Sequence, residues 1–263
     1  AEKQASDLFF SVGSPITIKI NGVCVPINQD RLAPQAIVSL LAERLTDAHF
    51  RELEDSRELN IGLPVQGIGS FRLSAFLQRG SISAVIRFIP HDVPKLDALH
   101  LPEVLKDLIM ERRGMILVVG AAGSGKSTTI ASMLDHRNEL STGHVLTFED
   151  PIEYLFRNKK SIINQREIGS DARTLQAALR SAMRQAPDVI FIGEIRDRDT
   201  MSAAIAYSMS GHLVVATLHA TNSSHALNRV ISFYPPETRQ ALFQDMSVAM
   251  KAIVSQRLIR SKR

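Results

Sequence analysis

The sequence has no Trp and only 3 Tyr, so it offers few of the aromatic side chains on which nucleic-acid bases stack. Its formal net charge of +4 is small, and the charges are spread along the chain instead of gathering in one basic run. This balance permits an anionic ligand such as a nucleotide, but it disfavours a nucleic-acid partner.

Cysteine and long apolar runs are also scarce. The single cysteine, Cys24, excludes an intramolecular disulfide and any multi-cysteine zinc site, and it fits a reducing compartment. No apolar run approaches the roughly 20 residues that a membrane-spanning helix requires. The start, AEKQASDLFF, has neither an initiator Met nor a cleavable signal pattern. We therefore expect a cytoplasmic protein without an integral membrane segment.

The 263 residues are enough for two domains, each with its own core. The stretch IPHDVPKLDALHLP (89–102) has three prolines and little periodicity, so it predicts a domain boundary. We place a first domain at 1–90, a linker at 91–100 and a second domain at 101–263.

The first ninety residues are typical of a small α+β domain. LFFSV and ITIKI are short β-like runs, and 33–50 predicts a helix because its apolar residues recur at helical spacing, namely Ile37, Leu40, Leu41 and Leu45. The runs 69–80 and 81–90 are strand-like and join at a glycine, as in a hairpin. An antiparallel sheet is expected here.

Strands and helices alternate after the boundary. LPEVLKDLIMERRG (101–114) and DARTLQAALRSAMRQ (171–185) predict helices. Four compact runs rich in β-branched residues predict buried strands, at 115–119, 144–148, 188–192 and 212–217. Buried strands separated by helices favour an α/β domain whose mostly parallel sheet is covered on both faces.

GAAGSGKS (120–127) fits the pattern G-x-x-x-x-G-K-[ST] between a predicted strand and the helix-compatible STTIASML. The glycines allow backbone N–H groups to turn toward phosphate oxygens, and the helix N-terminus adds partial positive charge. Lys126 reaches the β- and γ-phosphates and Ser127 holds Mg²⁺ in such a loop. The predicted nucleotide-binding residues are Gly120, Gly123, Ser124, Gly125, Lys126, Ser127 and Thr128.

Two acidic segments follow at predicted strand ends. DVIFIGEIRD places Glu194 where a Walker B acid organises Mg²⁺ and its waters, although that position is generally Asp. TFEDPIE (147–153) follows a strand that lies in sequence between the P-loop helix and the Glu194 strand, an order typical of RecA-like NTPases. It is therefore where a base that activates water would lie. A solvated turn is the alternative for Glu149 and Asp150.

The run HLVVATLHA has a histidine at each end of another predicted strand. His212 and His219 are candidate sensors of the γ-phosphate, although a single His is more often structural.

GAAGSGKSTT, TFEDPIE, INQREIG, GEIRD and GHLVVATLHATN together resemble the secretion-type hexameric ATPases, specifically the type IV pilus retraction motors of the PilT/PilU family. ASDLFFSVGSPITIKING and FRLSAFLQRGSISAVIRFIP also resemble the PAS-like first domain of that family, so the resemblance covers nearly the whole chain. GAAGSGKS in place of the usual GPTGSGKS is closer to PilU.

By position, the resemblance implies roles for several residues. It makes Glu153 the general base, Lys126 the Walker A lysine and Glu194 the Walker B glutamate. It makes His212 and His219 the paired His-box histidines. It also implies that first-domain arginines close over the γ-phosphate, for which Arg72 and Arg87 match best and Arg79, at the hairpin turn, less well. Solvated strand charges are the alternative for these arginines.

The resemblance further implies a homo-hexamer that uses ATP and Mg²⁺, works on an inner-membrane platform protein at the cytoplasmic face and drives pilus retraction in twitching motility. A paralogous retraction ATPase is a possible second partner. Members of the family usually continue beyond IVSQRLIRSKR into a segment tied to retraction, so we expect this chain to hydrolyse ATP without being a complete motor.

Two rivals stay open. A pilus-extension or type II secretion ATPase shares the fold, but commonly carries a four-cysteine zinc module that one cysteine does not build. An accessory subunit would bind ATP and depend on a partner motor for activity.

Overall fold

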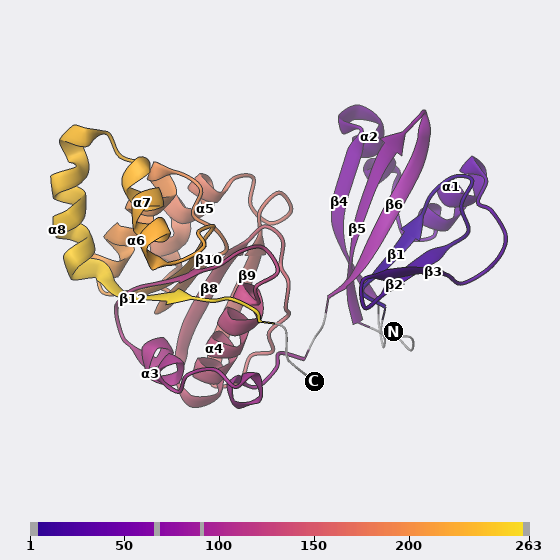
Figure 1. Cartoon of the computed structure of the whole chain (residues 1–263). Coiled ribbons are helices and arrows are strands. Elements are labelled where there is room, and N and C mark those ends of the chain that lie inside the picture. Colours follow the sequence, from indigo (N-terminus) through magenta and orange to yellow (C-terminus); the bar gives the residue numbers. More distant parts are fainter. Residues whose placement is uncertain (1–4, 66–68, 90–91, 260–263) are drawn as a thin grey trace. The chain divides into compact units, whose positions relative to one another are not determined.

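The computed structural model describes residues 5–65, 69–89 and 92–259. The chain divides into two compact units, Ala1–His91 and Asp92–Arg263 (Figure 1). No helix among the described residues is long and apolar enough to cross a membrane.

The first unit is built on a six-stranded sheet in the order β3-β2-β1-β6-β5-β4, in which every described pairing is antiparallel. The predicted hairpin is confirmed by two long strands that pair from Ser70↔Ile89 to Gln78↔Ser81. The strands are β1 (Asp7–Phe10), β2 (Thr17–Ile20), β3 (Val23–Pro26), β4 (Glu58–Val65), β5 (Gly69–Gln78) and β6 (Ser81–Ile89).

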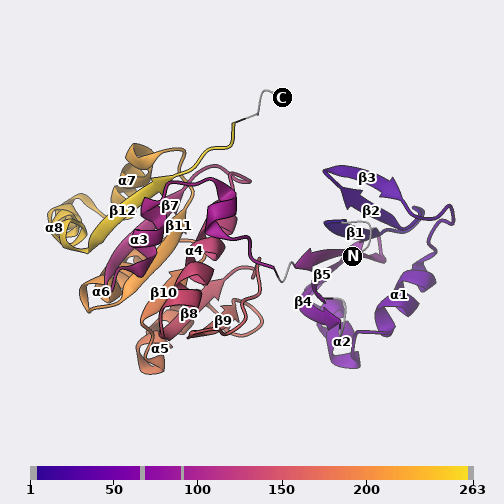
Figure 2. The ribbon, with the colours of Figure 1, turned by 90° about the horizontal axis from the view of Figure 1, so that it is seen from below.

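Two helices, α1 (Pro34–Ala42) and α2 (Asp47–Ser56), pack on one face of this sheet (Figure 2). A single helix over 33–50 was predicted, and this is wrong. Thr46 ends the run because its hydroxyl accepts from the His49 backbone N–H and caps a new helix. Ile37, Leu41 and Leu45 are buried as their spacing predicted, whereas Leu40 is exposed.

The second unit is a six-stranded sheet in the order β12-β7-β11-β10-β8-β9, in which every described pairing is parallel. This arrangement confirms the predicted RecA-like α/β fold. The strand that precedes Glu194, β10, lies inside the sheet between β8 and β11. The strands are β7 (Gly114–Val119), β8 (Gly143–Glu149), β9 (Ser161–Glu167), β10 (Val189–Ile192), β11 (Leu213–Leu218) and β12 (Met250–Ser255). β9 and β12 were not predicted as strands.

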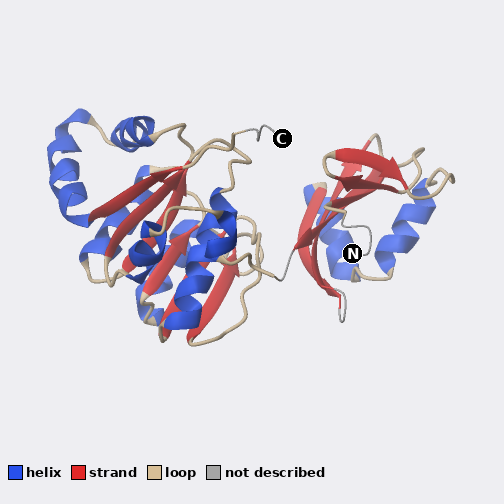
Figure 3. Cartoon of the chain, turned by 60° about the horizontal axis from the view of Figure 1, so that its bottom comes forward, coloured by secondary structure: helices blue, strands red, loops and turns tan. Residues whose placement is uncertain are grey.

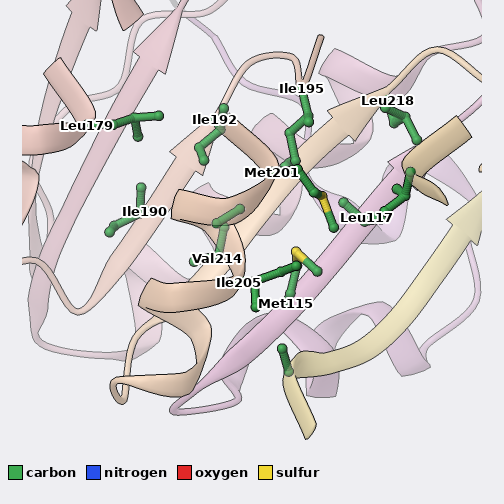
Figure 4. Packing of buried hydrophobic residues seen from close by; sticks show 14 of the residues in the cluster. Met115, Leu117, Leu179, Ile190, Ile192, Ile195, Met201, Ile205, Val214 and Leu218 are labelled. Carbon is green, nitrogen blue, oxygen red and sulfur yellow. The ribbon is translucent and has the colours of Figure 1, made fainter. Parts of the chain in front are cut away.

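Helices cover both faces of this sheet (Figure 3). One core cluster joins alternate strand residues such as Met115, Leu117 and Ile190 to Met201 and Ile205 (Figure 4). A second core cluster joins Ile116 and Val118 to the helices on the opposite face of the sheet. The helices are α3 (Val104–Met110), α4 (Lys126–Leu140), α5 (Leu175–Ala182), α6 (Arg198–Met209), α7 (Ser223–Ser232) and α8 (Arg239–Ala249), with short 3-10 turns η1 (Leu96–Leu99), η2 (Met183–Gln185) and η3 (Pro236–Thr238).

Most of the segment predicted as a linker (91–100) packs as part of the second unit. The Ser132 hydroxyl of α4 donates to the Pro94 carbonyl at 2.7 Å, Lys95 forms an ion pair with Glu139 of α4, and Leu96 is buried. Residues 90 and 91 lie outside the described residues. The segment after them is therefore anchored on the same helix that begins at the P-loop.

The β5–β6 turn yields a stability prediction. Arg79 and Gly80 both have positive φ, 51° and 77°, and Asn-Gly is the pair that such two-residue hairpin turns favour. We expect Arg79→Asn to raise the free energy of unfolding by roughly 0.5 kcal/mol, because Arg is costly in the left-handed region and Asn less so. Gly80→Ala should lower it by about 1 kcal/mol. Urea denaturation followed by circular dichroism measures both, and equal stability of the two variants would contradict the turn geometry.

Candidate nucleotide site

The carboxyl ends of β7, β8, β10 and β11 surround one cavity of about 780 Å³. Its lining includes Lys126 and Ser127 from the P-loop and Glu194 and His219 from the two central strands. Parallel strands bring their carboxyl ends to one edge, so motifs far apart in sequence meet here. The end of β8 and the segment that follows it contribute Glu149, Asp150 and Glu153.

The P-loop has the conformation that phosphate binding requires. Gly123 and Gly125 have φ of +73° and +90°, and α4 begins immediately afterwards at Lys126. The Lys126 ammonium group donates to the carbonyls of Gly120 and Ala121, each at 3.0 Å. The Ser124 hydroxyl is buried and has no hydrogen-bond partner among the described residues. An unsatisfied donor beside a lysine and a helix N-terminus fits a bound phosphate.

Gln256, which sequence reasoning missed, supports this loop from behind. Its backbone N–H donates to the Val119 carbonyl at 2.8 Å, and its side-chain amide oxygen accepts from the Thr129 hydroxyl at 2.8 Å. A Cβ added at Gly120 would lie 2.5 Å from the Gln256 carbonyl, and one at Gly125 would lie 2.9 Å from its amide nitrogen. At Gly120 the backbone of Gln256 leaves no room for a side chain, whereas at Gly125 the φ of +90° is what favours glycine.

The three acids after β8 have different surroundings. Glu149 is buried, and its carboxylate accepts from Thr147 at 2.6 Å and from Gln165 at 3.1 Å. Burial raises its pKa from 4.5 to about 7, with these hydrogen bonds opposing the shift. Asp150 and Glu153 are exposed. The acids that looked alike in sequence are one buried group and two that face solvent.

Glu194 lies between two cationic or potentially cationic neighbours. Arg196 donates to it at 2.6 Å and reaches Asp150 at 3.5 Å, so one guanidinium bridges the two acidic segments. The His219 ring lies 3.4 Å from the other Glu194 oxygen. Arg196 was missed, although its place two residues after Glu194 in GEIRD is a signal.

Other predicted residues are not brought to this cavity. His212 lies at the opposite end of β11 from His219, about 20 Å away at the usual rise per strand residue, and it contacts the Tyr207 carbonyl at 3.2 Å. Gly120 and Ser124 belong to the loop but not to the cavity lining. Thr128 does line the cavity, and its hydroxyl is 3.0 Å from the Tyr154 hydroxyl.

The arginines predicted as a clamp belong to the first unit. Arg72 and Arg87 are direct partners across β5 and β6, on the sheet face away from α1 and α2. Arg87 forms an ion pair with the buried Asp7 at 2.7 Å. Burial raises the pKa of Asp7 and the contact with Arg87 lowers it, and the net result is a lowered pKa. Arg79 lies in the exposed turn.

A P-loop that opens a helix at the carboxyl edge of a parallel sheet, with acids on the neighbouring strands, defines a P-loop NTPase of the RecA-like class. The family described as Type II/IV secretion system protein matches residues 1–262.

Relatives and solved structures agree with this class. The type IV pilus ATPase PilU of Pseudomonas aeruginosa is 43% identical over 258 residues, which cover 98% of this chain and 68% of that protein. The retraction ATPase PilT of the same organism is 38% identical over 99% of this chain and 76% of its own length. A crystal structure of the pilus retraction motor PilT with bound ADP matches with a TM-score of 0.93 and 39% identity, over 98% of this chain and 76% of that one. The chain belongs to the type II/IV secretion system protein family, and its fold is that of the nucleotide-using PilT motor.

The buried Glu149 predicts a pH dependence of stability. Its pKa in the folded protein, about 7, lies above its ordinary value of 4.5, so the folded state binds more protons between these values. The free energy of unfolding should therefore fall as pH rises from 4.5 to 7, by up to about 3 kcal/mol.

Glu149→Gln should remove this contribution, so the variant gains stability over the parent as pH rises. Urea denaturation between pH 5 and pH 8 measures the difference. Asp150→Asn, which alters the exposed neighbour, should keep the pH dependence of the parent protein. Parallel curves for parent and Glu149→Gln would contradict the buried ionisation.

Proposed function

We propose that the protein is an ATP hydrolase that powers retraction of type IV pili through nucleotide-driven motion. The observation that carries the proposal is a cavity that joins the P-loop lysine to acids from two neighbouring strands, in a chain 43% identical to the pilus ATPase PilU. The pilus retraction motor PilT has the same fold.

Lys126 and the loop glycines bind the phosphates of ATP in this proposal. The Lys126 ammonium group, held by two carbonyls of its own loop, exchanges those contacts for phosphate oxygens. Thr128 adds a hydroxyl at the start of α4.

Ser127 and Glu194 are the proposed Mg²⁺ residues. Among the described residues, no group of three or more His, Cys, Asp or Glu side chains is placed to hold a metal ion unaided. This fits Mg²⁺, which is usually held by one or two protein oxygens together with substrate phosphates and water. When bound, the ion neutralises charge that develops on the phosphates.

Glu153 is the proposed general base. Its carboxylate takes a proton from water as the water oxygen bonds to the γ-phosphorus, and the bond from that phosphorus to the bridging oxygen breaks to leave ADP and phosphate. Glu153 is exposed and lines the cavity, so its carboxylate is accessible to a water molecule there. Glu149 and Asp150 orient the segment, and His219 senses hydrolysis through Glu194.

Arg72 and Arg87 are the proposed γ-phosphate clamp, with Arg79 as the weaker candidate. The two side chains lie directly opposite each other across β5 and β6, so they could approach one anionic group together, although Arg87 is already paired with Asp7. His212 lies outside the cavity lining of its own chain, so it is given no part in the hydrolysis step.

The working assembly is proposed to be a homo-hexamer at the cytoplasmic face of the inner membrane that acts on a platform protein, with a paralogous retraction ATPase as a further partner. Such a ring would turn ATP hydrolysis into movement between the two units of each chain.

Two substitutions test the chemistry. Lys126→Ala should abolish nucleotide binding, because it removes the cation that holds the phosphates. Glu153→Gln should keep binding and lower kcat by roughly 10²- to 10⁴-fold, since only the base is removed. Titration with a fluorescent ADP analogue and a phosphate-release assay measure the two effects. Lys160→Ala and Glu237→Gln, at exposed positions outside the cavity lining, are the matched controls. Normal hydrolysis by the Glu153→Gln protein would rule out this residue as the base.

Activity with and without a partner separates a motor from an accessory subunit. We expect the purified chain to hydrolyse ATP by itself, because Lys126, Glu153 and Glu194 line one cavity of one chain. Phosphate release is measured for the chain alone and for a mixture with a paralogous retraction ATPase whose own Walker A lysine has been removed. Hydrolysis that appears only in the mixture would favour the accessory subunit.

A further inference from the structure

The strand β9 contains most of the motif INQREIG, for which the proposed chemistry has no role. It is the edge strand of the parallel sheet and runs beside β8, whose end leads into the acidic segment. Gln165 and Glu167 are two residues apart, so their side chains leave the same face of β9. Both side chains bind the main chain of the segment that carries Glu153.

Gln165 makes three hydrogen bonds with its side-chain amide. The nitrogen donates to the Tyr154 carbonyl at 2.8 Å and to the Glu149 carboxylate at 3.1 Å. The oxygen accepts from the Phe156 backbone N–H at 2.9 Å. One amide therefore holds the chain at two points just after Glu153 and ties them to the end of β8.

Glu167 holds the other side of Glu153. Its carboxylate accepts from the Ile152 backbone N–H at 3.0 Å, and its own backbone N–H is fixed by the Asp171 carboxylate at 2.8 Å. Glu153 is thus flanked by Ile152 and Tyr154, and a β9 side chain binds the main chain of each.

These contacts matter because the segment has little support of its own. Among the described residues, the main-chain groups of 151–158 form no hydrogen bonds with other main-chain groups outside regular elements, and the segment is not itself a helix or strand. A loop without such a ladder takes its position from side chains that bind it. The Tyr154 hydroxyl adds one link to Thr128 of α4, at 3.0 Å.

We propose that Gln165 is a positioning residue for ATP hydrolysis, which fixes the Glu153 carboxylate over the γ-phosphate by holding the main chain on its C-terminal side, with Glu167 holding the N-terminal side. The inference rests on the proposed role of Glu153 as the base. A base must be held within about half an ångström of its productive place, and a displacement of about 1 Å costs on the order of 10²-fold in rate.

The first test is Gln165→Leu, which keeps the volume of the side chain and removes its three hydrogen bonds. We expect kcat to fall roughly 10- to 100-fold, while the Kd for a fluorescent ADP analogue stays within about a factor of 3, because the P-loop does not contact Gln165. Asn164→Ala is the matched control: Asn164 is the neighbouring residue on the opposite face of β9, and its side chain accepts from His144 at 2.9 Å. The control should keep the parent kcat. A Gln165→Leu protein with the parent kcat, or with nucleotide affinity lost in parallel with kcat, would overturn the proposal.

The second test separates positioning of Glu153 from general support of the sheet. In the Glu153→Gln background, adding Gln165→Leu should cause no further loss of kcat, since the group that Gln165 positions is already gone. Two losses that multiply would show that Gln165 acts independently of Glu153, and would overturn the inference.

Gln165→Met covers the case in which the leucine variant does not fold. Its unbranched side chain follows the path of glutamine, removes the donor to Tyr154 and Glu149 and adds no charge beside the buried Glu149, so the same loss of kcat is expected with a preserved thermal unfolding transition. The two proposals fail separately. Full hydrolysis by Glu153→Gln contradicts the proposed function, whereas inactive Glu153→Gln together with fully active Gln165→Met contradicts only the role of Gln165.

Discussion

The parallel pairing of β7, β11, β10 and β8 is the constraint on which the rest of the second unit depends. Both faces of these strands are buried under helices, so their registers are fixed by packing on two sides. Because all four strands run the same way, the P-loop, the acidic segment, Glu194 and His219 leave the sheet at one edge. The cavity is a result of topology, and its chemistry comes from the residue that ends each strand.

Strands and helices with a strong local pattern were predictable from the sequence, and those that depend on distant partners were not. The runs at 115–119, 144–148, 188–192 and 212–217 became β7, β8, β10 and β11 because their composition suits a strand buried on both faces. β9 alternates buried and exposed residues at an edge, and β12 is mostly half-buried, so neither has that composition. The break at Thr46 was missed because its hydroxyl caps a new helix that begins at Asp47, and the apolar spacing of 33–50 gives no sign of that restart.

Most residues of the site were predictable from the sequence, but their burial and their contacts with one another were not. The sequence places acids and a P-loop lysine at strand ends, yet Glu149 differs from Asp150 and Glu153 through burial, which no spacing reveals. Gln165 lies in the motif INQREIG and Gln256 just after β12, but neither segment indicated what its glutamine contacts, and each side chain is placed by the pairing of its strand. His212 shows the opposite case: a strand has two ends, and only the carboxyl end meets the cavity. Residue types predict chemistry, while strand direction decides which residues take part.

The pairing of β12 with β7 has a consequence for synthesis of the chain. The P-loop follows β7, but Gln256, which supports the loop, follows β12. A ribosome therefore makes the loop, the acids and both histidines before it makes Gln256. Contacts between such distant segments form late in folding. Until Gln256 has been made, the P-loop of the nascent chain lacks its rear support, so the fully supported loop forms only after β12 pairs with β7.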